Sequence, residues 1–294
     1  MNKNFTKIIS AVLLLLLIAS CNRELTLDSV HSSYLEVNNL QIHYKEYGHG
    51  EKTLIFVHGW GCDLNAWQYQ FSHFKNQYRL VFIDLPGYGK SDKPNRQYTI
   101  DLFAESVLAV IDDLDIRKPL LIAHSMGLPV CIEVIKRLEN NEAELCIVDG
   151  VYFSFPNDSI DYQSYKAGLN AFADMFKGED YTQNVEQFAK GFITDTTPSA
   201  VRDYILSTMT QTPVYVGYSS MLSLIDDNNW SKEKLANRTI AIYARTAGLA
   251  PDNKNILMEQ FPDLTYLEMK EVNHFLMMEK PDEFNKILKE FIDR

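Results

Sequence analysis

Short apolar runs alternate along this chain with segments in which apolar residues recur at helical spacing. The apolar runs predict strands at 53–57, 78–83, 119–123, 143–148, 239–244 and 264–269. The helical spacing predicts helices at 99–114, 130–138, 255–261 and 281–292, and a β-hairpin is expected at 35–47. Strands and helices that alternate in this way indicate an α/β fold, in which helices cover both faces of a parallel sheet.

The pattern changes between residues 152 and 230, where strand-like runs stop and aromatic residues become frequent. Helices are expected there at 163–176 and 199–209. We therefore expect one core, formed by residues 34–150 and 236–294, that carries a helical insertion at 151–235. The insertion is interpreted as a cap, or lid, over a pocket. A small helical subdomain with its own aromatic core is a compatible interpretation.

The first 21 residues differ from the rest of the chain. Lys3 and Lys7 flank the start of an apolar run that is shorter than the roughly 20 residues of a membrane span. A basic start, an apolar run and a small-residue end are typical of an export signal. The ending Ile18–Cys21 resembles the lipobox of bacterial lipoproteins.

The lipobox resemblance implies that residues 1–20 are removed and that Cys21 is acylated. The protein would then be lipid-anchored in the cell envelope, on the periplasmic or extracellular side. Residues 21–33 are polar and weakly patterned, and we expect them to form a tether between anchor and domain. An ordinary signal, or an uncleaved anchor that happens to end in Cys, is the alternative.

Composition narrows the range of partners. The 294 residues carry a formal net charge of −11, which argues against nucleic acid because its binding depends on clustered Lys and Arg. A hydrophobic content of 46% excludes wholesale disorder. The acidity does not argue against the expected membrane association, because a lipid on Cys21 needs no basic surface. The sequence does not define the oligomeric state.

A serine between a predicted strand and a predicted helix is the first candidate for chemistry. The sequence Ala123-His124-Ser125-Met126-Gly127 has small residues two positions before and two positions after the serine. A tight strand-to-helix turn needs such residues, and it exposes the serine hydroxyl at the edge of a sheet. The alternative is a serine that only caps the helix.

Together with three other motifs, this serine makes residues 35–294 resemble the α/β-hydrolase superfamily. The other motifs are Val57–Gly61, Asp84–Ser91 and Asn273–Phe275, and the four occur in the order and spacing of the family. The resemblance implies a mostly parallel, eight-stranded sheet with an inserted helical cap. It also implies that Ser125 is the nucleophile, that His274 is its base, and that the backbone amides of Trp60 and Met126 form the oxyanion hole.

The acid of the triad is where the chain departs from the family pattern. Family members usually carry it after the strand at 239–244, but here Ala247 and Gly248 occupy the expected position. Asp149, which closes the preceding strand, is our candidate because some members place the acid there. Asp252 is the alternative acid, and a site without an acid is the third interpretation. Asp149 could also be a structural carboxylate that binds loop amides.

Other candidate residues receive structural interpretations. Asp84 follows a strand and is expected to brace the turn that begins at Pro86, and because Ser125 occupies the nucleophile position, epoxide and halide chemistry are disfavoured. Cys131 and Cys146 lie in apolar patterns and are interpreted as buried hydrophobes, and a nucleophilic role for Cys62 is not expected. No metal-ligand spacing, dinucleotide motif or P-loop is found, so no cofactor or metal is expected.

These observations predict a hydrolase that acts on ester bonds through an acyl-enzyme. The aromatic insertion favours a small substrate with an apolar or aromatic acyl group. Amides, lactones, carbon–carbon bonds and peracid formation use the same machinery. The rival hypothesis is a non-catalytic, ligand-binding lipoprotein on a decayed hydrolase fold, motivated by the missing acid and by Ala123 in place of the usual glycine.

Overall fold

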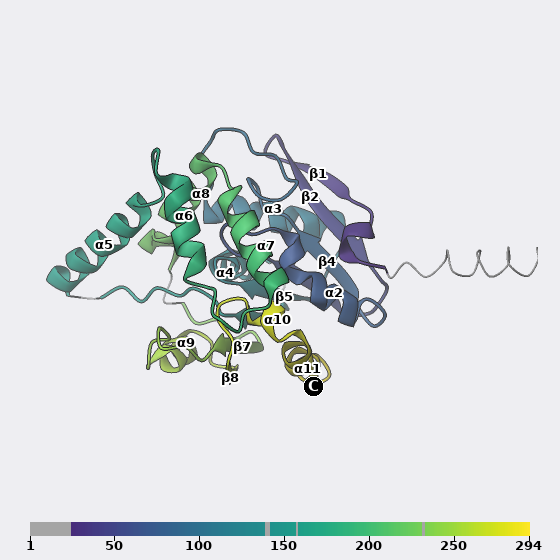
Figure 1. Cartoon of the computed structure of the whole chain (residues 1–294). Helices are drawn as coiled ribbons and strands as arrows, with labels where there is room; N and C mark the ends of the chain where they lie inside the picture. Colours follow the sequence, from purple (N-terminus) through teal and green to yellow (C-terminus); the bar gives the residue numbers. More distant parts are fainter. Residues whose placement is uncertain (1–24, 139–141, 157, 231–232) are drawn as a thin grey trace, which may run out of the picture.

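The computed structural model describes residues 25–138, 142–156, 158–230 and 233–294. They form one eight-stranded sheet with the strand order β1-β2-β4-β3-β5-β6-β7-β8 (Figure 1). The strands are β1 Ser33–Val37, β2 Leu40–Tyr47, β3 Thr53–Val57, β4 Arg79–Ile83, β5 Pro119–His124, β6 Glu144–Val148, β7 Thr239–Ala244 and β8 Leu264–Met269. The β1–β2 and β2–β4 pairs are antiparallel and the remaining pairs are parallel, which confirms the predicted α/β fold.

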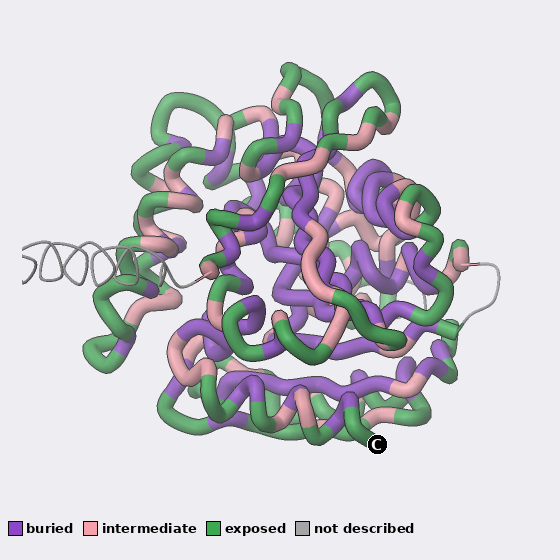
Figure 2. The backbone as a smooth tube through the Cα atoms, turned by 90° about the vertical axis from the view of Figure 1, so that its right-hand side faces the viewer, coloured by how far each residue is buried: buried purple, intermediate pink, exposed green. Residues whose placement is uncertain are grey.

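Helices cover the sheet, as the alternating pattern predicts. The helix α3 packs against α4, and α2 packs against α10 and α11. The central strands β3 and β5 are buried along their whole length, as expected for strands covered on both faces. Figure 2 shows the resulting buried interior, surrounded by exposed turns. The helices outside the insertion are α2 Gln68–Phe74, α3 Ile100–Asp113, α4 Gly127–Arg137, α9 Asn253–Gln260, α10 Leu276–Glu279 and α11 Pro281–Ile292.

Local sequence signals account for several of these boundaries. The Thr99 side chain accepts a hydrogen bond from the Leu102 amide at 3.1 Å and so caps the start of α3. Asn38 and Asn39 both adopt positive φ in the β1–β2 turn, a conformation that Asn tolerates better than most residues. Pro281 begins α11, where its missing N–H removes no helical bond.

Among the described residues, four α-helices lie between β6 and β7 in the chain: α5 Ser159–Asp174, α6 Tyr181–Lys190, α7 Ser199–Thr210 and α8 Val214–Leu224. We call them the cap helices. Within this group α6 packs against α7 and α5 against α8, while α5 extends away from the rest of the molecule (Figure 1). Polar contacts join α8 to the core, since the Ile100 amide donates to Ser223 at 2.9 Å and the Tyr88 hydroxyl lies 2.8 Å from that of Ser220.

The chain before β1 differs from the expected tether. Leu27 is only 2% exposed, and it begins a short 3-10 turn, Leu27–Ser29, that packs on the core. The Lys45 ammonium donates to the carbonyl oxygens of Leu27 and Asp28 at 2.8 and 3.0 Å. The part of the expected tether at residues 25–33 therefore packs on the core through the buried side chains of Leu27 and Val30.

The proposed signal (1–20) and Cys21 lie outside the described residues. Within the described ranges, no helix combines the length and the apolar character that crossing a bilayer requires.

Candidate active site

Ser125 lies on a tight turn between β5 and α4. It adopts a φ of +53° and is 8% exposed. Its amide donates to the Val148 carbonyl of the neighbouring strand end at 3.2 Å. A Cβ on Gly127 would lie 2.7 Å from the Val57 carbonyl oxygen, so only glycine lets α4 begin this close to β3. The strained backbone and the small flanking residues are the features expected of a turn that exposes a serine hydroxyl at the edge of the sheet.

Two backbone amides beside Ser125 have no internal partner. A Cβ on Gly59 would lie 2.8 Å from the Ser125 Cβ, which places the loop that carries Trp60 directly against the serine. Met126 is the N-cap residue of α4. Within the described residues, neither the Trp60 nor the Met126 amide donates a hydrogen bond. Free amides beside a nucleophile, one of them at a helix N-terminus, can stabilise a developing oxyanion.

His274 is held in the turn between β8 and α10. Its Nδ1 lies 2.7 Å from the Asp149 Oδ2, and its ring stacks on Phe192 with 4.5 Å between centroids. His124 Nε2 lies 3.0 Å from the His274 carbonyl oxygen. Burial, and then the neighbouring His274, lower the pKa of His124 well below its usual value, so His124 is a neutral donor to this carbonyl. These contacts leave the Nε2 edge of His274 available for a substrate or a serine.

Asp149 uses its two oxygens for two purposes. Its Oδ2 accepts from His274, and its Oδ1 accepts from the Ala244 amide at the end of β7 at 2.8 Å. Asp149 itself adopts a φ of +44° directly after β6. Both interpretations of this residue are therefore present, because one carboxylate binds a loop amide and orients an imidazole.

The alternative acid, Asp252, lies elsewhere. It occupies the N-cap position of α9 and is exposed. In the part of the chain that the structure describes, its carboxylate makes no hydrogen bond or ion pair with His274.

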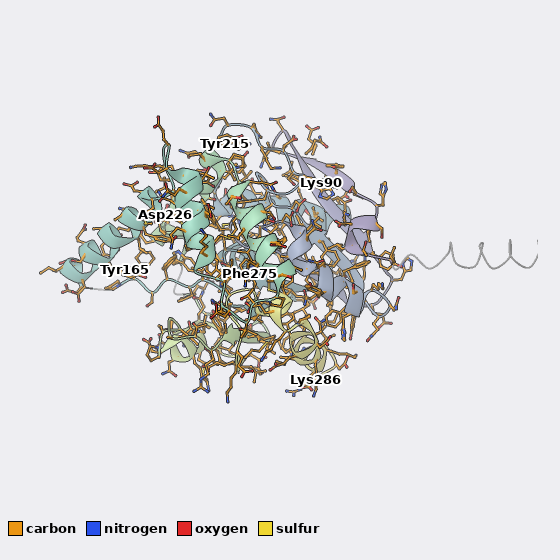
Figure 3. All side chains as sticks on the ribbon, in the orientation of Figure 1. Lys90, Tyr165, Tyr215, Asp226, Phe275 and Lys286 are labelled. Carbon is orange, nitrogen blue, oxygen red and sulfur yellow. The ribbon has the colours of Figure 1, made fainter. Side chains whose placement is uncertain are left out.

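Ser125 and His274 line one cavity of about 290 Å³, which we call the catalytic cavity. The structure records no hydrogen bond between their side chains among the described residues. The remaining wall is almost entirely apolar, with side chains from the loop after β6, from the cap helices and from the C-terminal turn: Val151, Phe153, Phe172, Phe188, Phe192, Met209, Met221, Leu224 and Phe275. Figure 3 shows Phe275 where the cap helices meet the core.

The sequence pattern did not predict the contributions of three residues that line the catalytic cavity. Met209 and Met221 line the catalytic cavity from α7 and α8, and nothing in the sequence distinguishes them from core residues. Trp60, for which the sequence indicates only a role of the backbone amide, also contributes its side chain. Its Nε1 donates to the Gly217 carbonyl at 2.9 Å, and its ring lies 5.0 Å from that of Phe176, so it ties the amide-bearing loop to the cap helices.

Comparison with known proteins agrees with this architecture. Residues 52–132 match a family model described as the alpha/beta hydrolase fold. A solved esterase from Exiguobacterium antarcticum superposes with a TM-score of 0.78 at 17% identity, over 90% of this chain and 100% of that one. This chain has the α/β-hydrolase fold.

Two curated proteins illustrate its relatives. The chain is 25% identical over 253 residues to the AB hydrolase superfamily protein YisY of Bacillus subtilis, which covers 84% of this chain and 93% of that protein. It is 34% identical over 104 residues to epoxide hydrolase 1 of Caenorhabditis elegans, which covers 34% of this chain and 26% of that protein.

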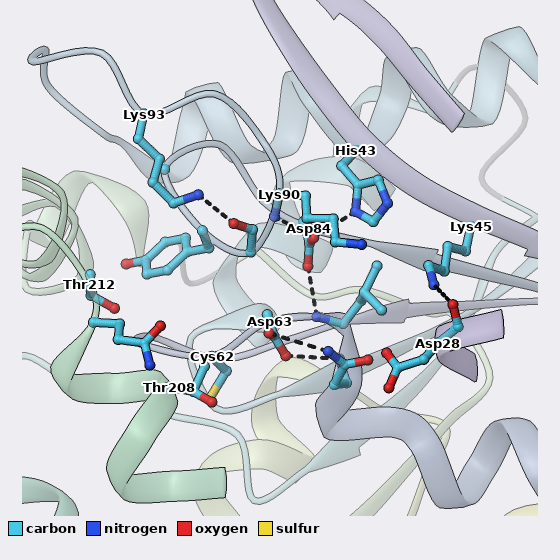
Figure 4. Close-up of a pocket in the computed structure, with 16 residues that line it drawn as sticks. Asp28, His43, Lys45, Cys62, Asp63, Asp84, Lys90, Lys93, Thr208 and Thr212 are labelled. Atoms are coloured by element: carbon cyan, nitrogen blue, oxygen red, sulfur yellow. Dashed lines mark hydrogen bonds and ion pairs between the residues drawn. The ribbon is translucent and has the colours of Figure 1, made fainter. Parts of the chain in front are cut away.

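A second cavity of this α/β-hydrolase fold, about 310 Å³ in volume, is polar and lies on the other side of Cys62, which lines both cavities (Figure 4). Asp84 projects into it but is fully engaged. Its carboxylate contacts His43 Nδ1 at 2.7 Å and accepts from the amides of Leu64 and Lys90, each at 2.8 Å. Burial opposes ionisation of Asp84, but the hydrogen bond from His43 and the nearby His58 hold its pKa below the usual value.

This arrangement confirms that Asp84 braces the turn after β4. A Cβ on Gly89, which has a φ of +50°, would lie 2.1 Å from the Asp84 Cγ, so glycine is required at that position.

Cysteine and metal chemistry find no support in the described ranges. Cys62, Cys131 and Cys146 are free and buried, and burial raises the pKa of all three thiols. A buried, protonated thiol at Cys62 is a poor nucleophile. Among the described residues, no group of three or more His, Cys, Asp or Glu side chains is placed to hold a metal ion.

Proposed function

We propose that this chain is a serine hydrolase that cleaves carboxylic esters, with Ser125, His274 and Asp149 as its catalytic triad. The observation that carries the proposal is that Ser125, on a strained strand-to-helix turn, shares one cavity with the His274 imidazole, whose Nδ1 lies 2.7 Å from the Asp149 carboxylate. Nucleophile, base and orienting acid are the three parts that activation of a serine hydroxyl requires.

The proposed reaction has two halves. The Ser125 Oγ attacks the ester carbonyl carbon while His274 Nε2 takes the hydroxyl proton, and the amides of Trp60 and Met126 bind the resulting oxyanion. As the carbon–oxygen bond to the alcohol breaks, His274 returns that proton to the leaving alkoxide. Water then loses a proton to His274, attacks the acyl carbon and releases the carboxylic acid, and Ser125 recovers its proton.

The lining of the catalytic cavity favours a substrate with an apolar or aromatic acyl group. Its wall is almost entirely apolar apart from the histidines and Ser125, and its 290 Å³ lies at the lower limit of ordinary ligand pockets. The structural neighbour from Exiguobacterium antarcticum is an esterase, which is consistent with an ester substrate. The epoxide hydrolase likeness does not extend to the nucleophile we propose, because epoxide hydrolases of this fold use an aspartate where this chain has Ser125.

Labelling with a fluorophosphonate tests the proposal. The probe is expected to label the wild-type protein and to leave Ser125→Ala unlabelled, and p-nitrophenyl esters of graded chain length are expected to be hydrolysed only by the protein with Ser125. A folded wild-type protein that neither reacts with the probe nor hydrolyses any ester would instead indicate a ligand-binding protein on a decayed hydrolase fold.

We also propose that the protein is anchored to the cell envelope by a lipid on Cys21. The lipobox-like ending at residues 18–21 supports it. Cys21→Ser is expected to move the protein from the membrane fraction to the soluble fraction, with Cys62→Ser as the matched control, because Cys62 is buried in the domain. Unchanged membrane association of Cys21→Ser would overturn this proposal.

A further inference from the structure

A third hollow lies beside the catalytic cavity, between the loop after β6, α5 and α9. We call it the outer groove. It has a volume of about 710 Å³, and its aromatic lining consists of Tyr152, Phe153, Phe155, Tyr162 and Trp230. Most of these rings are only partly buried. Aromatic side chains that cluster around one partly open pocket are typical of a ligand-binding surface.

We propose that the outer groove binds the end of the substrate that does not fit in the catalytic cavity, so that the enzyme acts on elongated esters that end in a neutral aromatic group. This inference rests on the proposed esterase function and specifies its substrate class.

Phe153 connects the two spaces, because its side chain lines both the catalytic cavity and the outer groove. The backbone leads from one to the other. Val151 lines the catalytic cavity and its amide donates to the Ser125 carbonyl at 3.2 Å, while Tyr152 and Phe155 line the groove. A substrate that passes Phe153 would therefore have its reactive carbonyl at Ser125 and its far end in the groove.

The rings of the groove are held in place by contacts at their edges. Trp230 donates from Nε1 to the Leu224 carbonyl at 2.8 Å, and it packs edge-to-face on Tyr152 and Phe153 at 5.4 and 5.3 Å. The Tyr162 hydroxyl donates to Asp227 at 2.8 Å, and the Tyr152 hydroxyl donates to Gln260. Rings fixed in this way lose little conformational freedom when a flat ligand binds between them.

The charges at the groove favour a neutral ligand over an acidic one. Among the described residues, Asp227 and Glu259 line it together with the cation Lys234. Asp227 also forms an ion pair with Lys166 at 3.0 Å, and Lys166 in turn lies over the Phe155 ring, 5.4 Å from its centroid. Counting Lys166, the described residues place two carboxylates and two ammonium groups at the groove, so no net positive charge attracts an acidic ligand, whose carboxylate would lose hydration against the aromatic lining.

Esters with and without an aromatic end test the contribution of the outer groove separately from that of the catalytic cavity. We would measure kcat/KM by pH-stat for three esters. Ethyl butanoate carries no naphthyl group, ethyl 4-(2-naphthyl)butanoate carries one on the acyl side, and 2-(2-naphthyl)ethyl butanoate carries one on the alcohol side. We expect the wild-type enzyme to prefer one of the naphthyl esters. The ratio of kcat/KM for that naphthyl ester to kcat/KM for ethyl butanoate should fall about 2- to 13-fold in Phe155→Ala and in Tyr162→Ala. This is the range expected for the loss of one aromatic contact.

Tyr34→Ala is the matched control, because Tyr34 is an exposed aromatic residue on β1, at the far edge of the sheet. It should leave the ratio unchanged. A naphthyl ester that also carries a ring carboxylate should be a poorer substrate than its neutral counterpart. Ratios that stay within twofold of wild type in both groove variants, or a wild-type enzyme without preference for either naphthyl ester, would overturn the proposal.

Binding measured by calorimetry tests the outer groove independently of the proposed esterase activity. Each naphthyl ester is titrated into Ser125→Ala and into the double variant Ser125→Ala/Phe155→Ala, neither of which is expected to hydrolyse it. Weaker binding by the double variant supports the groove even if the wild-type enzyme hydrolyses no ester. Equal binding by both overturns the groove even if the wild-type enzyme is an active esterase.

Discussion

Asp149 contacts His274 at 2.7 Å although the two residues are 125 positions apart and the carboxylate follows β6 rather than β7. Because β6 and β7 are parallel neighbours, their carboxyl ends meet at the same edge of the sheet. A carboxylate at the end of either strand can therefore reach the same imidazole. This explains how the site can be complete although Ala247 and Gly248 occupy the more common acid position.

Asp149→Asn is expected to lower kcat for a p-nitrophenyl ester by about four orders of magnitude. The asparagine would favour the wrong imidazole tautomer, and it carries no charge that could stabilise the imidazolium. Asp252→Asn is the matched control and should retain kcat within about twofold, since Asp252 makes no contact with His274. Thermal melting should show that both variants fold, because an asparagine at 149 still accepts from the Ala244 amide. Equal activity of the two variants would refute Asp149 as the acid.

Gly59→Ala is expected to reduce kcat by about 10²- to 10³-fold, the cost of losing one oxyanion donor. The new Cβ would lie 2.8 Å from the Ser125 Cβ, so the loop that carries the Trp60 amide must move away from the serine.

Gly168→Ala provides the contrasting case, because nothing lies within 4 Å of the Cβ it would add to α5. It should raise the free energy of unfolding by about 0.5–1 kcal/mol and leave kcat unchanged. Wild-type activity in Gly59→Ala would remove the Trp60 amide from the mechanism.

Asp63 should make the stability of the protein depend on pH near neutrality. Burial, and then the charge of Asp84, raise the pKa of Asp63 to about 6 from an ordinary value of 3.8. Because the folded state holds this proton more tightly than the unfolded state, Asp63 favours folding below about pH 4. That contribution is lost as pH rises through 6, where the buried carboxylate ionises.

Asp63→Asn removes this titration and keeps a side chain that can accept from the Asn65 amide. Relative to wild type, its free energy of unfolding in urea should be higher at pH 8 than at pH 4, by at most about 3 kcal/mol. Asp203→Asn, on an exposed site of α7, should show no such pH-dependent difference. A constant difference between Asp63→Asn and wild type from pH 4 to 8 would show that Asp63 titrates normally.

Phe188→Ala should change the length of acyl chain that the enzyme prefers. The ring lies between Phe172 and Phe192, 5.6 and 4.8 Å from their centroids, and lines the catalytic cavity. Its removal enlarges the cavity, so the best p-nitrophenyl ester should shift to a longer chain.

The free energy of unfolding should fall by up to about 3 kcal/mol, less than for a fully buried ring. Phe188→Leu should give a smaller shift in both properties. An unchanged preference in both variants would show that acyl groups bind elsewhere.

The elements of the core could be predicted because their signals are local. The bounds of β7, β8 and α11 agree with the sequence pattern residue for residue, since each has its own apolar periodicity and its own terminal signals. The positions of Ser125 and His274 after strand ends followed for the same reason. The packed segment around Leu27 could not be predicted, because its burial depends on Lys45, which lies on β2.

The walls of the two substrate spaces depended on tertiary structure to a greater degree. Met209 and Met221 face the serine only because α7 and α8 lie over the carboxyl edge of the sheet, and helical periodicity does not say which neighbour a helix face meets. Phe153 likewise lines both the catalytic cavity and the outer groove only because of how the loop after β6 packs in the folded chain.

The sequence by itself determined the α/β architecture, the serine turn and the candidate base, since periodicity, small residues and turn signals act over a few neighbouring positions. Only the tertiary structure placed Asp149, and not Asp252, beside His274 and placed Ser125 at an apolar cavity. These relationships run across parallel strands and between helices far apart in the chain, and their distances are set by how the elements pack together rather than by any local run of residues.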